Sequence, residues 1–388
     1  MFGLSGIRFR ALVVSTVLGL FAAGPAGAGQ TPSTLDDPDF FPIGVWLQGP
    51  HNAERYKAIG INTYVGLWDG PTAEQLASLK KVGLFVVADQ NDVALASPDN
   101  DIIVAWMQQD EPDNAQPLPL NLGYGQPVPP GEVVARYEAM KARDATRPIF
   151  MNLGQGVAWD GWHGRGSRSG HQEDYPLYLR GADIVSFDIY PAVHWSAEVA
   201  GRLEMVAHGV ERLRGWAAPG QIVWNCIEAS RIGNLERKPT PHEIRAEVWM
   251  SLIHGSRGLI YFVHQFEPNF VEASLLEDDE LSAAVAAINE QVRDLAPVLN
   301  SPTVEGAVET GTDPASAPIA VMAKSHEGAL YVFAVAMNDR PASATFTLAG
   351  KGPTSAKTLG EERSIEISTE GSFTDSFEPY GVHLYRIE

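Results

Sequence analysis

Short apolar runs alternate with amphipathic stretches along most of this chain. Eight runs are short enough for buried strands, at residues 43–48, 61–68, 84–89, 103–109, 148–153, 184–189, 222–227 and 259–264. Helices are predicted between them at 72–82, 131–143, 197–216 and 241–254, and after the last run at 280–295. Strands that alternate with helices in this way are typical of a parallel α/β sheet.

The number and spacing of these units favour a closed sheet. Eight strand-then-helix units within about 255 residues match an eight-fold β/α barrel. The alternative is a doubly wound open sheet, which carries a glycine-rich phosphate-binding turn after its first strand. Here that position reads Gln48-Gly49-Pro50-His51-Asn52, which is not such a turn. We therefore predict a barrel over residues 38–300.

The pattern changes after residue 300. Five short apolar runs, at 319–323, 329–336, 343–348, 364–367 and 381–387, are separated by Gly, Pro and Asp turns with no helical stretch between them. This predicts an antiparallel β-sandwich over residues 301–388. The predicted fold class is therefore α/β, a (β/α)8 TIM barrel followed by a small all-β sandwich domain.

The first 29 residues have the pattern of a secretion signal. Arg8 and Arg10 precede an apolar segment at 11–23, and Ala26-Gly27-Ala28 resembles a cleavage site. An uncleaved membrane anchor is disfavoured because the apolar segment is shorter than the ~20 residues of a spanning helix. We expect a signal peptide at residues 1–29 and a secreted or periplasmic protein with no membrane attachment after signal removal.

Composition narrows the choice of partner. The net charge of −20 argues against nucleic acid and polyanionic substrates, because repulsion between like charges slows encounter. A neutral partner fits better, although acidity can also serve solubility alone. The single cysteine, Cys226, cannot form an intrachain disulfide, and we expect it to be a packed apolar residue. The sequence leaves the oligomeric state open.

Two glutamates each follow an apolar run of the predicted barrel. Glu111 comes after the fourth run, within Asp110-Glu111-Pro112, and Glu228 ends the seventh, before Ala229. The carboxyl ends of the strands form the catalytic face of such a barrel. Cleavage of a glycosidic bond requires one carboxylic acid and one carboxylate, and two strand ends can supply them.

With these motifs on the fourth and seventh strands, the chain resembles clan A of the retaining glycoside hydrolases, the four-and-seven barrels. The resemblance covers roughly residues 41–298, and the C-terminal domain resembles the accessory sandwich of many such enzymes. It implies Glu111 as the acid/base and Glu228 as the nucleophile. Asp110 replaces the usual Asn, which binds the sugar 2-hydroxyl. Because Asp accepts but does not donate, the sugar contact differs at this position.

Other strand ends suit a sugar as well. Sugars present apolar faces and hydroxyl edges, so aromatic and amide side chains at one rim of the barrel fit them. For each residue taken singly, loop capping or strand packing is an equally good explanation. The resemblance further implies that Tyr190 hydrogen-bonds the nucleophile. The predicted substrate-binding residues are Asp110, Tyr190, Trp68, Asn152, Trp159, Trp162, Trp195 and His264.

The sequence therefore predicts an exported retaining glycoside hydrolase that cleaves a neutral poly- or oligosaccharide by double displacement. No cofactor is expected. A metal site is disfavoured because no His-x-x-x-His spacing occurs, and a serine nucleophile because no Gly-x-Ser-x-Gly elbow occurs. Two alternatives stay open. One is a carbohydrate-binding barrel without catalysis, and the other is a transglycosylase that uses the same residues.

Overall fold

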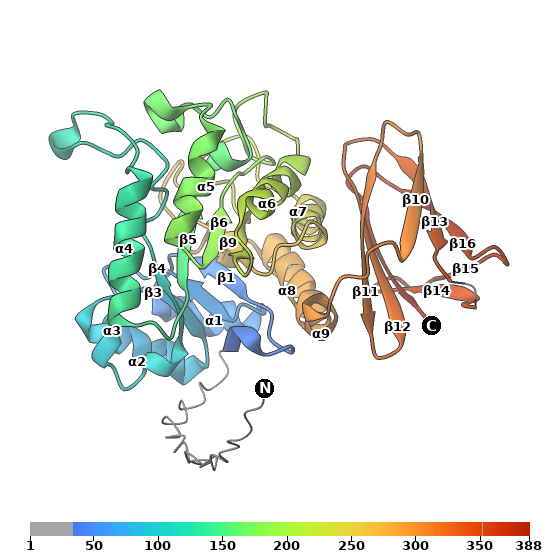
Figure 1. Ribbon diagram of the computed structural model, residues 1–388, viewed down its shortest axis with the longest axis horizontal. Helices are drawn as coiled ribbons and strands as arrows, with labels where there is room; N and C mark the ends of the chain where they lie inside the picture. The colour runs from blue at the N-terminus through green and yellow to red at the C-terminus, as the bar shows by residue number, and fades with distance from the viewer. Residues whose placement is uncertain (1–33, 351) are drawn as a thin grey trace, which may run out of the picture. The chain divides into compact units, whose positions relative to one another are not determined.

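The computed structural model of the protein describes residues 34–350 and 352–388 (Figure 1). The expected signal peptide, residues 1–29, lies outside the described residues. Within the described ranges, no helix combines the length and apolar character needed to cross a membrane. The α/β elements end at Asn300, and the β domain begins at Val308.

Parallel strands form the barrel, and every apolar run predicted for it contains one. Their order in the sheet is β7-β6-β5-β4-β3-β2-β1-β9-β8. The predicted (β/α)8 barrel is confirmed, with the seventh run divided into two short strands. The strands are β1 (Ile43–Trp46), β2 (Thr63–Val65), β3 (Phe85–Asp89), β4 (Ile103–Met107), β5 (Ile149–Leu153), β6 (Ile184–Phe187), β7 (Ile222–Val223), β8 (Asn225–Glu228) and β9 (Leu259–Phe262).

The seventh run closes the barrel. Its first half, β7, pairs with β6, and its second half, β8, pairs with β9. At the break, the Trp224 N–H donates to the Val185 carbonyl at 2.9 Å, while the next N–H, of Asn225, donates to Gly258 at 3.3 Å. The Trp224 indole packs inside the barrel against Phe150, with ring centroids 5.6 Å apart. One continuous segment therefore joins both edges of the sheet.

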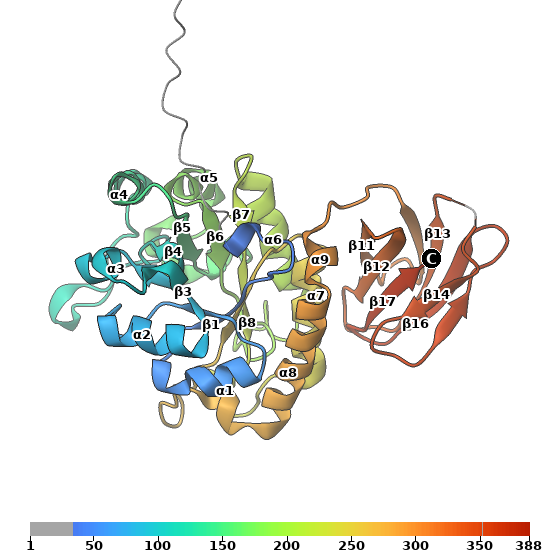
Figure 2. The same cartoon turned by 90° about the horizontal axis from the view of Figure 1, so that it is seen from below.

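Helices surround the strands, as Figures 1 and 2 show. Capping boxes begin α2, through Thr72, and α7, through Thr240. Helix α6 starts at Glu204 instead of residue 197, because Gly201 before it has a left-handed φ of 76°. The helices are α1 (Ala53–Ala58), α2 (Ala73–Val82), α3 (Asp92–Ala96), α4 (Pro130–Arg143), α5 (Tyr175–Tyr178), α6 (Glu204–Trp216), α7 (Pro241–Ile253), α8 (Asp279–Asp294) and α9 (Ala296–Asn300).

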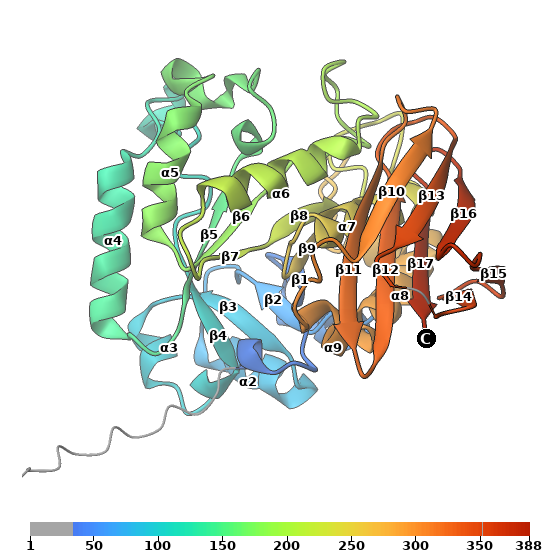
Figure 3. The same cartoon turned by 45° about the vertical axis from the view of Figure 1, so that its right-hand side comes forward.

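The C-terminal domain consists of two antiparallel sheets that face each other (Figure 3), which confirms the predicted sandwich. Phe346, Phe373 and Tyr385 pack between the sheets. Three strands, β10, β14 and β16, were not predicted, and β10 has no buried residue that an apolar pattern could reveal. One sheet contains β10 (Val308–Asp313), β13 (Ala342–Leu348) and β16 (Ser372–Phe377), and the other contains β11 (Ile319–His326), β12 (Ala329–Ala336), β17 (Val382–Ile387), β14 (Ser355–Thr358) and β15 (Ser364–Glu366).

Helix α7 is packed on two sides. It covers β8 of the barrel through the contact of Asn225 Nδ2 with Ser251 Oγ at 2.8 Å. On its other side, Trp249 packs on Phe333 of β12 with ring centroids 5.3 Å apart. Nearly every residue from Ile244 to Ile253 is consequently buried. A charged side chain within residues 246–253 has little access to water.

Two glycines of α6 provide a test of how that helix packs on β6. A Cβ at Gly209 would lie 2.2 Å from the fully buried Phe187 ring, whereas a Cβ at Gly215 would meet no atom within 4 Å. We expect Gly215→Ala to raise the free energy of unfolding by up to about 1 kcal/mol through helix propensity. We expect Gly209→Ala to lower it by about 1–2 kcal/mol, because overpacking outweighs that gain. Urea denaturation measures both, and changes of the same sign would contradict the packing of α6 on β6.

Candidate active site

The carboxyl ends of β4, β5 and β6 bring polar side chains together. The Glu111 N–H donates to the Asn152 carbonyl at 3.0 Å, and the Asp188 N–H donates to the Leu153 carbonyl at 3.1 Å. Because these carbonyls belong to successive residues of β5, Glu111 and Asp188 flank the end of that strand. Asn152 Nδ2 also donates to Asp110 Oδ1 at 3.1 Å. Three carboxyl groups and one amide therefore share this edge of the barrel.

The side chains of Glu111 and Asp188 form a carboxyl pair, close enough for each to change the pKa of the other. Burial, followed by the charge of Asp188 and the hydrogen bond with it, raises the pKa of Glu111 well above its ordinary value. Burial raises the pKa of Asp188 to about 7. Burial and the charge of Glu111 likewise raise the pKa of Asp110 to about 7. Because two carboxylates in contact cannot both ionise easily, the pair keeps a proton at neutral pH.

The backbone at Glu111 is strained. Its φ of 41° lies in the left-handed region, which costs a residue other than glycine about 1–3 kcal/mol. The Glu111 carbonyl is held by the Asn114 N–H and by Gln116 Nε2, both at 3.1 Å. Leu47 and Asp69, which follow β1 and β2, also have positive φ values. Strain of this kind gathers at functional sites, so it supports the strand ends as the site.

A buried ionic network supports the loops after β4 and β5. Asp113 accepts hydrogen bonds from the Gly154 N–H at 3.0 Å and from the Tyr175 hydroxyl at 3.1 Å. Arg165, which is 1% exposed, donates through Nε to the Asp113 carbonyl at 3.2 Å and through Nη2 to Asp174 at 2.9 Å. These contacts tie both loops to the barrel. Residues 114–130 and 154–172 are therefore anchored close to the carboxyl pair.

Glu228 ends β8, as the sequence predicts. Its carboxylate accepts hydrogen bonds from the backbone of the loop after β6. Its Oε1 accepts from the Ala192 N–H at 2.5 Å and its Oε2 accepts from the Val193 N–H at 2.9 Å. Glu228 is fully buried, and burial raises its pKa to about 7, although hydrogen bonds from Glu247 and the two N–H groups oppose that shift. The structure thus brings Glu228 to Glu247, and Glu111 to Asp188.

A line of aromatic rings runs along the same face of the barrel. Tyr190 packs on Phe262 at 5.0 Å, Phe262 on His264 at 5.2 Å, and His264 on Trp68 at 5.7 Å, measured between ring centroids. Tyr190 also hydrogen-bonds Asp188, so this line begins at the carboxyl pair. Trp68 is 40% exposed, and its Nε1 donates to Glu272 at 2.9 Å. Three predicted sugar-binding residues are therefore neighbours.

The three loop tryptophans differ in exposure. Trp159 is buried and donates through Nε1 to Glu198 at 2.7 Å, and Trp162 donates to Asn114 at 2.8 Å. Trp195 is 71% exposed and stacks on His194, with ring centroids 5.3 Å apart. Trp195 thus presents most of its ring to solvent, whereas Trp159 serves mainly to pack the loop.

Several residues of this region were not predicted as part of the site. Asp188 lies within Asp-Ile-Tyr-Pro after the sixth strand, and a carboxylate at a barrel strand end is a signal that could have found it. Phe266 and Phe270 extend the aromatic line and are 49% and 54% exposed. Arg165 could not be predicted in the same way, because its burial depends on contacts with Asp113 and Asp174 that the sequence does not reveal.

Cys226 lies beneath this cluster, inside the barrel. Its Sγ is buried 3.9 Å from Asn152 Oδ1, and burial raises the pKa of the thiol well above its ordinary value. A protonated, buried thiol is a poor nucleophile. In the part of the chain that the structure describes, no group of three or more His, Cys, Asp or Glu side chains is arranged to hold a metal ion.

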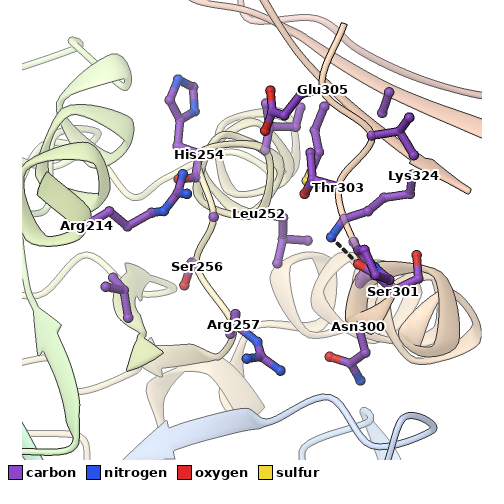
Figure 4. Close-up of a pocket in the computed structure, with 18 of the residues that line it drawn as sticks. Arg214, Leu252, His254, Ser256, Arg257, Asn300, Ser301, Thr303, Glu305 and Lys324 are labelled. Carbon is purple, nitrogen blue, oxygen red and sulfur yellow. Dashed lines mark hydrogen bonds between the residues drawn. The ribbon is translucent and has the colours of Figure 1, made fainter. Parts of the chain in front are cut away.

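A cavity of about 930 Å³ lies elsewhere, beside α6, α7 and β11 (Figure 4). Arg214, Arg257 and Lys324 contribute to its lining, and Lys324 Nζ donates to the Ser301 carbonyl at 2.7 Å. No residue of the predicted site lines it. The strand-end cluster is therefore the candidate active site, and this cavity is separate from it.

Comparisons with known proteins support the fold. No family model and no curated protein matches the chain. Among solved structures, α-amylases from Anoxybacillus and, complexed with acarbose, from Geobacillus thermoleovorans each match at 10% identity with a TM-score of 0.55, covering 90% of this chain and 98% of theirs. A putative α-galactosidase from Bacteroides fragilis matches at 11% identity with a TM-score of 0.51, covering 90% of this chain and 79% of that one. This chain shares the (β/α)8 barrel fold with these proteins.

Proposed function

We propose that this protein is an exported glycoside hydrolase that cleaves a neutral poly- or oligosaccharide, with Glu111 as its acid/base. The observation that carries the proposal is the Glu111–Asp188 carboxyl pair at the catalytic end of the barrel. A glycosidic oxygen must be protonated as its bond breaks. A carboxyl group that keeps its proton at neutral pH can supply that proton.

The fold and the surroundings of the pair support the same class of reaction. The similar solved structures include two α-amylases and a putative α-galactosidase, whose barrel fold this chain shares. Trp68 and Trp195 expose aromatic surface, and Asp110 and Asn152 offer polar groups near the pair. Such a mixture suits the apolar faces and hydroxyl edges of sugars. The net charge of −20 favours a neutral sugar, and residues 1–29 suggest a secreted or periplasmic location.

For the nucleophile we propose Glu228, as its place at the end of the seventh strand predicts. In a retaining mechanism Glu228 attacks the anomeric carbon while Glu111 protonates the leaving oxygen. Glu111 then deprotonates the water that releases the sugar from Glu228. Glu228 accepts hydrogen bonds from two backbone N–H groups, and these bonds favour its ionised form. Because Glu228 is fully buried, a sugar must displace the chain that covers it.

The role of Glu111 can be tested through the leaving group. We expect Glu111→Gln to lower kcat about 10²–10⁴-fold on an oligosaccharide found by screening a polysaccharide panel. A dinitrophenyl glycoside of the same sugar needs little protonation, so its rate of bond cleavage should fall far less. Glu290→Gln, at an exposed glutamate of α8, is the control and should leave both rates unchanged. Equal losses on both substrates would contradict an acid role for Glu111.

The carboxyl pair predicts a shift in the pH profile. Activity needs protonated Glu111, so it falls as the pH rises through the pKa of Glu111. Asp188→Asn removes the neighbouring negative charge, which lowers that pKa and should move the alkaline limb of kcat/KM to lower pH. Asp101→Asn, just before the opposite end of β4, is the control. An alkaline limb that stays in place in Asp188→Asn would show that Asp188 does not set the acidity of Glu111.

The role of Glu228 can be tested by chemical rescue. We expect Glu228→Ala to reduce hydrolysis of an activated aryl glycoside by several orders of magnitude, roughly the loss seen when a nucleophile is removed. Azide that enters the vacated space should restore part of the rate and give a glycosyl azide of inverted configuration, identified by NMR. Normal activity without azide would exclude Glu228 as the nucleophile.

A further inference from the structure

A second carboxyl pair, Glu228 and Glu247, is buried between β8 and α7. The contact of Asn225 Nδ2 with Ser251 Oγ at 2.8 Å sets the register of the helix on the strand. Glu228 follows Asn225 toward the end of β8, and Glu247 lies one helical turn before Ser251, toward the same end of the barrel. Both glutamates are 0% exposed, and their carboxyl groups are close enough for each to act on the pKa of the other.

The two carboxyl groups differ in the donors around them. Glu228 accepts hydrogen bonds from the N–H groups of Ala192 and Val193. In contrast, neither Oε1 nor Oε2 of Glu247 receives a hydrogen bond from an N–H or hydroxyl donor in the described part of the chain. The only hydrogen that can join the two glutamates is therefore a carboxyl proton.

The other charged groups near Glu247 do not compensate a charge on it. They are Glu243, one turn earlier on α7, and Arg237 in the loop before the helix. Arg237 Nη2 donates to both oxygens of Glu243, at 2.6 and 2.7 Å, so its charge is already paired. Trp249 and Phe333 close the side of α7 that faces the sandwich. An ionised Glu247 would be an unpaired charge in an apolar layer, which is strongly unfavourable.

The position of the shared proton follows from this asymmetry. Hydrogen bonds from N–H groups stabilise an ionised carboxylate, and Glu228 has two of them. Glu247 has none, so the proton is more stable on Glu247 than on Glu228. A protonated Glu247 can then donate to Glu228, which becomes the acceptor of three hydrogen bonds.

We propose that Glu247 is a positioning residue, a buried carboxylic acid whose proton is donated to Glu228 and holds that side chain ionised and oriented. The pairing itself needs no catalytic role for Glu228. Its consequence for the reaction rests on the proposed function, in which Glu228 is the nucleophile. Glu247 acts through Glu228 and does not touch the sugar.

The pairing makes stability depend on pH. The folded pKa of Glu247 lies well above its unfolded value of about 4.3, so above that pH the folded state holds a proton that the unfolded state has lost. Stability is fully present below the unfolded pKa and falls as the pH rises. Each proton held in this way raises the unfolding constant about tenfold per pH unit between about pH 5 and 7.

Denaturation measured across that pH range tests the proposal. We expect Glu247→Gln to fold, because its amide still donates to Glu228, and to show a pH dependence smaller by one proton, or about tenfold less change per pH unit. Its infrared spectrum should also lack one protonated-carboxyl band. Glu290→Gln, at an exposed helical glutamate, should match the unsubstituted protein in both measurements. An unchanged slope and spectrum in Glu247→Gln would overturn the proposal.

The pH dependence of kcat/KM tests separately whether the Glu228–Glu247 pair is used in catalysis. In Glu247→Met the donor to Glu228 is lost, which raises the pKa of Glu228 and should move the acidic limb of kcat/KM to higher pH, while Glu247→Gln restores the limb. The slope of stability against pH is independent of activity. A changed slope with an unmoved acidic limb would confirm the pair and reject Glu228 as the nucleophile. If Glu247→Met does not fold, the measurements on Glu247→Gln still decide the pairing.

Discussion

Residues 222–228 close the barrel, and this closure determines where the candidate site forms. One segment pairs with β6 through its first half and with β9 through its second half, and the Trp224 ring fills the interior at the break. A parallel sheet left open here would expose unpaired backbone groups on two edges. Closure brings the ends of β4, β5 and β6 to a common rim, and it places Glu228 at the junction of the two sheet edges.

Burial of carboxyl groups at that rim sets the chemistry of the site. Glu111 pairs with Asp188, and Glu228 pairs with Glu247. In both pairs the nearby charges are mostly other carboxylates, so protons take the place that cations occupy in ordinary ion pairs. In the proposed mechanism, Glu111 and Glu247 keep their protons, and Glu228 is the carboxylate that stays ionised. This arrangement joins the stability of the fold to the acidity of the site.

The loops after β4 and β5 connect this chemistry to a binding surface. Asp113 and Arg165 anchor them from below, and the strained Glu111 backbone is held between them. Trp195 is exposed in the loop after β6, and Trp68 and Phe270, which contact each other, are exposed after β2 and β9. Exposed aromatic rings on well-anchored loops suit the proposed recognition of a sugar, because such rings need little reordering when a ligand binds.

The eight strands of the barrel, and the place of each candidate residue relative to them, follow from the pattern of apolar residues along the chain. Parallel strands buried on both faces are continuous apolar runs, so all eight could be read from composition and spacing. Strand β10 could not be predicted from an apolar run, because none of its residues is buried. Its hydrogen bonds come from pairing with β13. The start of α6 was missed because Gly201 turns the chain. That Glu111 meets Asp188, and that Glu228 meets Glu247, depends on how the chain packs in three dimensions. Strand alternation alone does not tell where a side chain at a strand end points, because adjoining loops and an outer helix supply its partners.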